Sequence, residues 1–126
     1  MKIIKQSYKI DAKPEKVFEA LTNVKIIEKW SGGSAKMETK KGGRFSLWGG
    51  DIFGKNTEIV KNEKLVQEWS YKGWDKPSKV TFTLKSSGKG TTIELLQENV
   101  PDASHKSIAD GWKQYYLGQI KQLLEK

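Results

Sequence analysis

Alternation of apolar and polar residues dominates the middle of the chain and predicts strands, because successive side chains of a strand point to opposite faces. The alternation is loose over residues 3–10 and clean over 79–85, and further strands are expected at 34–39, 44–48, 52–60, 65–71 and 91–100. In the segment 79–85, Val80, Phe82 and Leu84 are predicted to share the buried face. Short polar or glycine-rich turns separate consecutive segments, so we expect an antiparallel meander.

Helical periodicity replaces the alternation in three places. An apolar stripe over about 14–22 follows Pro14, which suits the first turn of a helix. A second short helix is expected at about 24–29, and a long one closes the chain. The predicted fold is therefore α+β: a curved antiparallel sheet wrapped around a long C-terminal helix, with two short helices after the first strand.

The last helix is expected to be capped by Asp102 or Ser104. At 100° per residue, its inward residues fall within an arc of about 140°. This arc holds Ile108, Trp112, Tyr115, Tyr116, Gln119, Ile120 and Leu123. Gln119 stands among apolar neighbours, and a buried amide needs hydrogen-bond partners. We expect it either to pair with a sheet side chain such as Gln67 or to face a wet or ligand-bearing cavity.

Two glycines, Gly111 and Gly118, lie along one edge of the same arc. Each weakens a helix relative to alanine, so each calls for a compensating role. One interpretation is close approach of the helix backbone to the sheet or a loop. The other is an opening beside the helix for a ligand.

The chain of 126 residues is expected to form one domain, residues 1–126. It contains no cysteine, which excludes disulfides, thiol catalysis and cysteine-ligated metal sites. The single histidine, His105, is interpreted as a surface residue. The glycine-rich stretch 42–54 lacks the strand-to-helix context of a phosphate loop and has a possible bulge at Gly54. We therefore expect no catalytic residue, metal or cofactor.

The formal net charge is +8, but Arg44 is the one arginine among 23 basic residues and the lysines are spread along the chain. This pattern favours a lysine-rich solvated surface over a nucleic-acid site, and its excess charge favours an acidic protein partner. No run approaches the ~20 apolar residues of a membrane span, and the N-terminus does not look like a signal peptide. We expect a cytoplasmic protein.

Five tryptophans are many for this length. Trp30, Trp69 and Trp112 fit core or cavity walls. Trp48, which precedes two glycines, and Trp74, which lies in a polar loop, are the better candidates for exposed anchors on a partner surface.

Two longer motifs carry a family resemblance. The stretch "KKGGRFSLWGGDIFGKNTEIVKNEKLVQEWSYKGW" (40–74) has a Gly-Gly turn, a strand, a second glycine-rich turn and a strand pair ending in tryptophan. The stretch "GWKQYYLGQIKQLLE" (111–125) combines Gly-Trp, a Tyr-Tyr pair and Ile-Lys. Together they resemble the START-like, helix-grip (SRPBCC) superfamily, and within it the C-terminal domain of the activator of heat-shock-protein-90 ATPase. The resemblance implies a sheet wrapped around the last helix, with a cavity between them.

Three functional hypotheses follow. The first is a non-catalytic, co-chaperone-like binding protein whose partner is a heat-shock-protein-90-type chaperone or another acidic protein, with Arg44, Trp48 and Trp74 as candidate partner-surface residues. The second is a carrier or sensor of a small hydrophobic ligand, and a cavity below about 300 Å³ would argue against it. Its candidate cavity residues are Phe45, Leu47, Trp69, Phe82, Trp112, Tyr116 and Gln119. The third is a cavity enzyme of the cyclase or hydrolase type.

Overall fold

The computed structural model describes residues 1–71 and 73–125. Its sheet has seven strands in the order β1-β7-β6-β5-β4-β3-β2. Each neighbouring pair within the described residues is antiparallel. The strands are β1 (Lys2–Ile10), β2 (Ala35–Met37), β3 (Arg44–Leu47), β4 (Ile52–Val60), β5 (Lys64–Tyr71), β6 (Ser78–Ser87) and β7 (Gly90–Val100).

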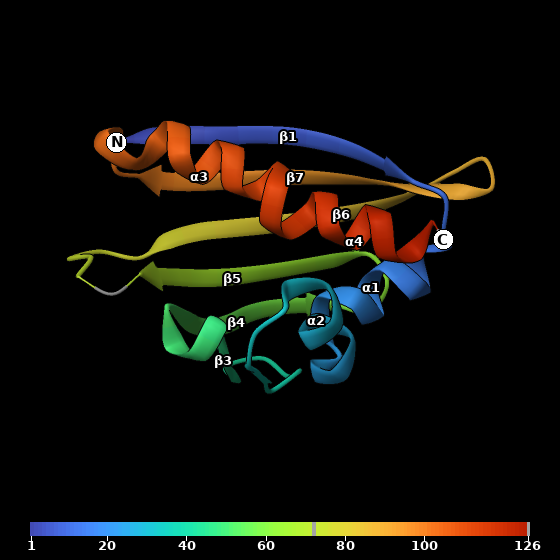
Figure 1. Cartoon of the computed structure of the whole chain (residues 1–126), viewed down its shortest axis with the longest axis horizontal. Coiled ribbons are helices and arrows are strands. Elements are labelled where there is room, and N and C mark those ends of the chain that lie inside the picture. The colour runs from blue at the N-terminus through green and yellow to red at the C-terminus, as the bar shows by residue number, and fades with distance from the viewer. Residues whose placement is uncertain (72, 126) are drawn as a thin grey trace.

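Two short helices, α1 (Pro14–Thr22) and α2 (Val24–Ser31), connect β1 to β2. The closing helix consists of α3 (His105–Gly111), a π-helical turn η3 (Trp112–Tyr116) and α4 (Leu117–Leu124). It runs across one face of the curved sheet, from beside the N-terminus to a position near α1 (Figure 1). The predicted α+β, helix-grip arrangement and its order of elements are confirmed.

The core lies between the sheet and the helices. Alternation along β6 buries Val80, Phe82 and Leu84, as predicted. The closing helix meets this layer with buried side chains at Ile108, Trp112, Tyr116, Leu117 and Ile120. The shorter helices α1 and α2 cover the other end of the same sheet face (Figure 1) with Val17, Phe18, Ala20, Leu21, Ile27 and Trp30.

The closing helix is not a regular α-helix, and this changes which residues face inward. The backbone N–H of Leu117 donates to the carbonyl of Trp112, five residues earlier. The extra residue in this turn rotates everything after it by about 100°. Leu117 becomes fully buried, while Tyr115 is 64% exposed. The prediction that Tyr115 lies within the inward arc is therefore wrong.

Gln119 is displaced by the same rotation. Its Nε2 donates to the carbonyl oxygen of Gln114 at 2.9 Å, within its own helix, and the side chain is half-buried. Both predicted environments for Gln119 are wrong: it neither pairs with Gln67 nor lines the pocket described below. Instead it satisfies a carbonyl that the π turn leaves without its usual α-helical partner.

Gly118 is explained by the π turn as well. A Cβ atom at this position would collide with the carbonyl oxygen of Lys113 in the same helix. The predicted close approach to the sheet or a loop is thus replaced by a close approach within the helix. The predicted side-chain cap of the helix is also absent: Ser104 occupies the N-cap position without a capping bond. Asp102 instead forms an ion pair with the N-terminal ammonium, with its Oδ1 atom 3.2 Å from the Met1 nitrogen.

The bulge expected at Gly54 is not found there. Gly54 pairs in regular register with Phe45 on one side and with Trp69 on the other, and the irregularity in β4 falls between Asn56 and Glu58. A Cβ atom at Gly54 would collide with the Glu68 carbonyl oxygen. Glycine is therefore needed for close packing of neighbouring strands rather than for a bulge.

Candidate functional site

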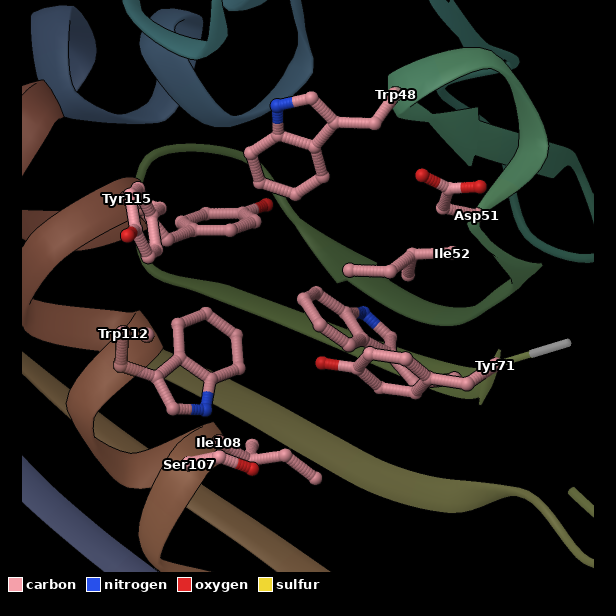
Figure 2. A pocket seen from close by; sticks show the side chains of 11 residues that line it. Trp48, Asp51, Ile52, Tyr71, Ser107, Ile108, Trp112 and Tyr115 are labelled. Atoms are coloured by element: carbon pink, nitrogen blue, oxygen red, sulfur yellow. The ribbon is translucent and has the colours of Figure 1, made fainter. Parts of the chain in front are cut away.

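A pocket of about 380 Å³ opens between the closing helix and the ends of β4 and β5, where Ile52 begins one strand and Tyr71 ends the other (Figure 2). Aromatic rings supply most of its wall. Its lining residues are Trp48, Asp51, Ile52, Trp69, Tyr71, Ser107, Ile108, Gly111, Trp112, Tyr115 and Tyr116. Gly111 belongs to this lining, and a Cβ there would meet only a Tyr115 ring carbon at 4.0 Å. This placement agrees with the second interpretation of that glycine, an opening beside the helix.

Trp48 reaches the pocket because the chain turns sharply after β3. Its φ of 51° is in the left-handed region, which is uncommon for a bulky residue and costs of order 1–3 kcal/mol. Its indole N–H donates to the Ser31 carbonyl at 2.9 Å. Gly33 leaves room for the ring, since a Cβ there would lie 2.8 Å from Trp48 Cδ1. The side chain predicted to be an exposed anchor is therefore a fixed, half-buried pocket wall.

Tyr116 is the centre of an aromatic cluster. Its ring centroid lies 4.5 Å from that of Trp30, 4.7 Å from that of Trp112 and 5.6 Å from that of Trp69. Such pairs contribute about 0.5–1.5 kcal/mol each beyond the area they bury. The tyrosine itself is 3% exposed. The cluster thus forms a rigid floor that connects the core to the pocket.

The indole N–H groups of the pocket are all engaged within the protein. Trp69 donates to Gln67 Oε1 at 2.7 Å, and Trp112 donates to Gln97 Oε1 at 2.8 Å. The Ser107 hydroxyl donates to the Ser104 carbonyl at 3.1 Å. These tryptophans therefore present their rings rather than their donors to the pocket, and its polarity comes from other groups.

That polarity comes from the Asp51 carboxylate and the hydroxyls of the lining tyrosines, of which Tyr71 and Tyr116 lie inside and Tyr115 is 64% exposed. The Tyr71 hydroxyl is directed toward Trp112, and Asp51 lies at the edge of the pocket (Figure 2). Within the described part of the chain, the hydroxyls of Tyr71 and Tyr116 form no hydrogen bond. Burial raises the pKa of Tyr71 to about 12. Burial also raises the pKa of Tyr116, and the neighbouring Tyr71 raises it further. Both phenols therefore stay protonated near neutral pH and remain hydrogen-bond donors.

The structure places the predicted cavity residues in two groups. Trp69, Trp112 and Tyr116 line the pocket. The remaining predicted residues, Phe45, Leu47 and Phe82, lie in the packed core, and Gln119 lies outside the pocket. Tyr71 was missed although the alternation in β5 already puts it on the face of Trp69. Asp51 was missed because no periodic pattern covers the turn in which it lies.

The three predicted partner-surface residues do not form one surface. Arg44 is exposed and lies in a groove on the outer face of the sheet, because alternation along β3 turns Phe45 and Leu47 inward. Trp74 packs on Tyr71 with ring centroids 4.4 Å apart, next to the pocket that Trp48 lines. An arginine on the outer face is thus separated from two tryptophans near the pocket.

Other candidate chemistry is dispersed over the described residues. Nε2 of His105 lies 3.2 Å from the Ile3 carbonyl oxygen. Glu94 is exposed and pairs with Lys85 at 2.9 Å. Residues 1–71 and 73–125 contain no group of three or more side chains suited to a metal ion. In the same part of the chain, none of the helices combines the length and hydropathy that crossing a membrane requires.

Comparison with known proteins connects this fold to curated relatives. The activator of 90 kDa heat shock protein ATPase homolog of Dictyostelium discoideum is 30% identical over 123 residues, which is 95% of this chain and 32% of that protein. The human homolog 1 is 28% identical over 111 residues, which is 86% of this chain and 33% of that protein. The chain therefore spans about a third of the length of these relatives.

A solved structure agrees with both relatives. An HSP90 activator from Plasmodium falciparum superposes with a TM-score of 0.91 at 29% identity, covering 97% of this chain and 95% of that chain. The family model described as Activator of Hsp90 ATPase homolog 1-like protein matches residues 11–125. With its START-like, helix-grip fold, the chain belongs to the family of Activator of Hsp90 ATPase homolog 1-like proteins.

Proposed function

We propose that this protein is a non-catalytic, co-chaperone-like partner of an Hsp90-type chaperone. The observation that carries the proposal is the family match over residues 11–125. The Plasmodium falciparum structure adds support, because a chain described as an HSP90 activator is covered over 95% of its length. A role in the cytoplasm, which suits a sequence without cysteine, belongs to the same proposal.

The charge distribution supports an acidic partner surface. The net charge of +8 would speed encounter with such a surface, in a way that weakens as salt increases. The outer groove places Arg44 near Lys36 and Lys55, with the 43% exposed ring of Phe53 among them. Glu38 and Glu68, the second of which pairs with Lys55 at 3.7 Å, also line it, so the three cations exceed the carboxylates by one. An aromatic ring beside cations is a common composition for a binding anchor. We therefore propose this groove as one contact, and Trp74 beside the pocket as another.

The test measures binding to a purified Hsp90-type chaperone by calorimetry, and the chaperone's ATP hydrolysis with and without this protein. We expect micromolar binding that weakens with added salt, together with faster hydrolysis. Absence of binding at micromolar concentrations would reject the proposal. Binding without faster hydrolysis would retain the partner and reject the activation.

Matched charge variants locate the contact. Arg44→Glu should weaken binding by at least about fivefold, which corresponds to an anchor residue. Lys89→Glu is the control: it also replaces a cationic side chain by a carboxylate, but in the exposed turn between β6 and β7, away from the groove. Equal effects of the two variants would show that net charge alone acts, and that the groove is not the contact.

A second candidate function is carriage or sensing of a small hydrophobic ligand. The favourable observation is the pocket volume of about 380 Å³, which exceeds the lower limit of about 300 Å³ for a drug-sized ligand. Its mostly aromatic wall is the usual lining of such sites. Titration with an apolar aromatic probe, followed by the shifts of the indole N–H signals in NMR spectra, tests this candidate.

A further inference from the structure

We propose that the pocket beside the closing helix binds a small, neutral, flat aromatic ligand whose carbonyl-type oxygen accepts hydrogen bonds from the hydroxyls of Tyr71 and Tyr116. This inference rests on the second candidate function and names its class of ligand. It starts from the unusual distribution of polar groups in the pocket, where the indole donors are engaged and the phenol donors are not.

The size and the walls of the pocket set the body of the ligand. A volume of about 380 Å³ is near the lower end of the range for ligand sites, so a compound of one or two rings suits it better than a long lipid. The walls offer ring faces and edges from Trp48 on one side and from Trp112 on the other (Figure 2). Flat aromatic ligands pack favourably between such rings.

Tyr116 sets the polar end of the ligand. It is 97% buried, it lines the pocket, and its hydroxyl has no hydrogen-bond partner within the described residues. The hydroxyl is open to the pocket and not sealed in the core, since Gln97 Nε2 is the one fully buried side-chain atom left unpaired among the described residues. An acceptor on a ligand can therefore take the place of water at this hydroxyl. The hydroxyl of Tyr71 reaches into the same pocket (Figure 2), and the rings of Tyr71 and Tyr116 both lie against Trp69, with centroids 6.3 and 5.6 Å from that of the indole. A carbonyl oxygen has two lone pairs and can accept from both.

The charge of the lining sets the charge of the ligand. Asp51 is the one charged side chain among the described lining residues, and none of those residues is basic. An anionic group would be desolvated by the aromatic wall without a counter-ion and would be repelled by Asp51. The pocket therefore favours a neutral acceptor over a carboxylate, although the protein as a whole is strongly basic.

Three probes of nearly the same shape test these points: 2-acetylnaphthalene, 2-ethylnaphthalene and 2-naphthoate. Their affinities are measured by NMR titration of the indole N–H signals. We expect the ketone to bind about tenfold more tightly than the hydrocarbon, the gain expected from hydrogen bonds to otherwise unpaired donors. The carboxylate should bind more weakly than the ketone. This comparison uses the unaltered protein and so does not depend on the folding of any variant.

Variants then assign the preference to the two hydroxyls. In Tyr116→Phe and Tyr71→Phe, the preference for the ketone over the hydrocarbon should fall toward one, while the affinity for the hydrocarbon stays the same. Tyr8→Phe is the matched control and should keep the preference, since the Tyr8 hydroxyl donates to Gln6 on β1, outside the pocket.

The outcomes separate this inference from the functions on which it rests. Equal affinities for ketone and hydrocarbon in the unaltered protein would overturn the inference and leave ligand carriage standing. A preference that survives in both tyrosine variants would also overturn it. Binding of none of the three probes would overturn the inference and the carrier function together. The chaperone interaction is measured separately and is affected by none of these results.

Discussion

The indole N–H of Trp112 donates a hydrogen bond to Oε1 of Gln97 over 2.8 Å, which joins the π-helical turn to β7. Trp112 is 2% exposed and Gln97 is fully buried. The other end of the amide, Nε2 of Gln97, has no partner among the described residues. The bond from Trp112 therefore compensates for the burial of one end of the Gln97 amide, in the layer between the helix and the sheet.

Replacing Trp112 by phenylalanine should be strongly destabilising. The change keeps an aromatic ring but removes the donor, which leaves the whole amide of Gln97 buried and unpaired. We expect a loss of about 2–5 kcal/mol in the free energy of unfolding, from the unpaired amide and the smaller ring together. Urea denaturation followed by circular dichroism measures it.

A second substitution separates the cost of the unpaired amide from the cost of the smaller ring. In the double variant Trp112→Phe with Gln97→Leu, no polar group remains to be paired, so the double variant should be more stable than Trp112→Phe alone by about 1–2 kcal/mol. If the double variant is less stable than the single one, the unpaired amide is not the main cost.

The two glycines of the closing helix should respond to alanine in opposite directions. In Gly118→Ala, the new Cβ collides with the Lys113 carbonyl, so we expect a loss of more than about 1 kcal/mol. In Gly111→Ala, the new Cβ has room and the φ of −62° is helical, so stability should rise by about 0.4–1 kcal/mol. Thermal unfolding of the two variants gives the comparison. Equal changes would contradict the presence of the π turn.

The buried amide of Gln67 should be needed for stability although it lies in an apolar layer. Its Nε2 donates to Asn56 Oδ1 at 2.8 Å, and its Oε1 accepts from Trp69 at 2.7 Å. Gln67→Leu removes both bonds and should cost about 2–4 kcal/mol, measured by urea denaturation. The exposed Gln122 provides the control, since Gln122→Leu should change stability by less than about 0.5 kcal/mol. A gain in stability for Gln67→Leu would contradict the role of this network.

Alkaline pH should unfold the protein through its pocket tyrosines. The folded-state pKa of Tyr71 is about 12, above the ordinary value, and that of Tyr116 is raised as well. A raised pKa means that the stabilising contribution is complete below about pH 10 and is lost as the pH rises toward 12. The ultraviolet absorbance of tyrosinate follows the ionisation of the tyrosines, and near-ultraviolet circular dichroism follows the loss of the folded structure.

We expect ionisation of these two tyrosines to coincide with the loss of near-ultraviolet signal. In Tyr71→Phe, the part of the absorbance change that accompanies unfolding should become smaller. If all four tyrosines of the chain ionise near pH 10 while the near-ultraviolet signal is unchanged, the pocket tyrosines are not buried as described.

The strands and short helices were predicted from the sequence because local patterns specify them. In β6, the alternation of Val80, Phe82 and Leu84 with polar residues matches the two faces of a strand. In α1, Pro14 and an apolar stripe mark the helix. The resemblance of 40–74 and 111–125 to the activator family pointed to the same fold, which the comparisons support.

The site was only partly predicted, because its geometry depends on exceptions to those patterns. Trp69 was placed correctly by the period of its strand. Trp48 was interpreted as an exposed anchor, since a positive φ that turns its ring into the pocket leaves no periodic signal. Gln119 was predicted to line the cavity because a helical wheel of 100° per residue assumes a regular α-helix.

By itself, the sequence determined the order of elements, the buried face of a cleanly alternating strand such as β6 and the lysine-rich character of the chain, because these follow from residue spacing and composition. Only the tertiary structure decided the phase of the closing helix. One additional residue in the turn at Trp112–Tyr116 rotates Leu117 into the core and Tyr115 out of it. That choice depends on how the helix packs against the sheet, where Trp112 meets Gln97, and a local pattern carries no information about such a contact.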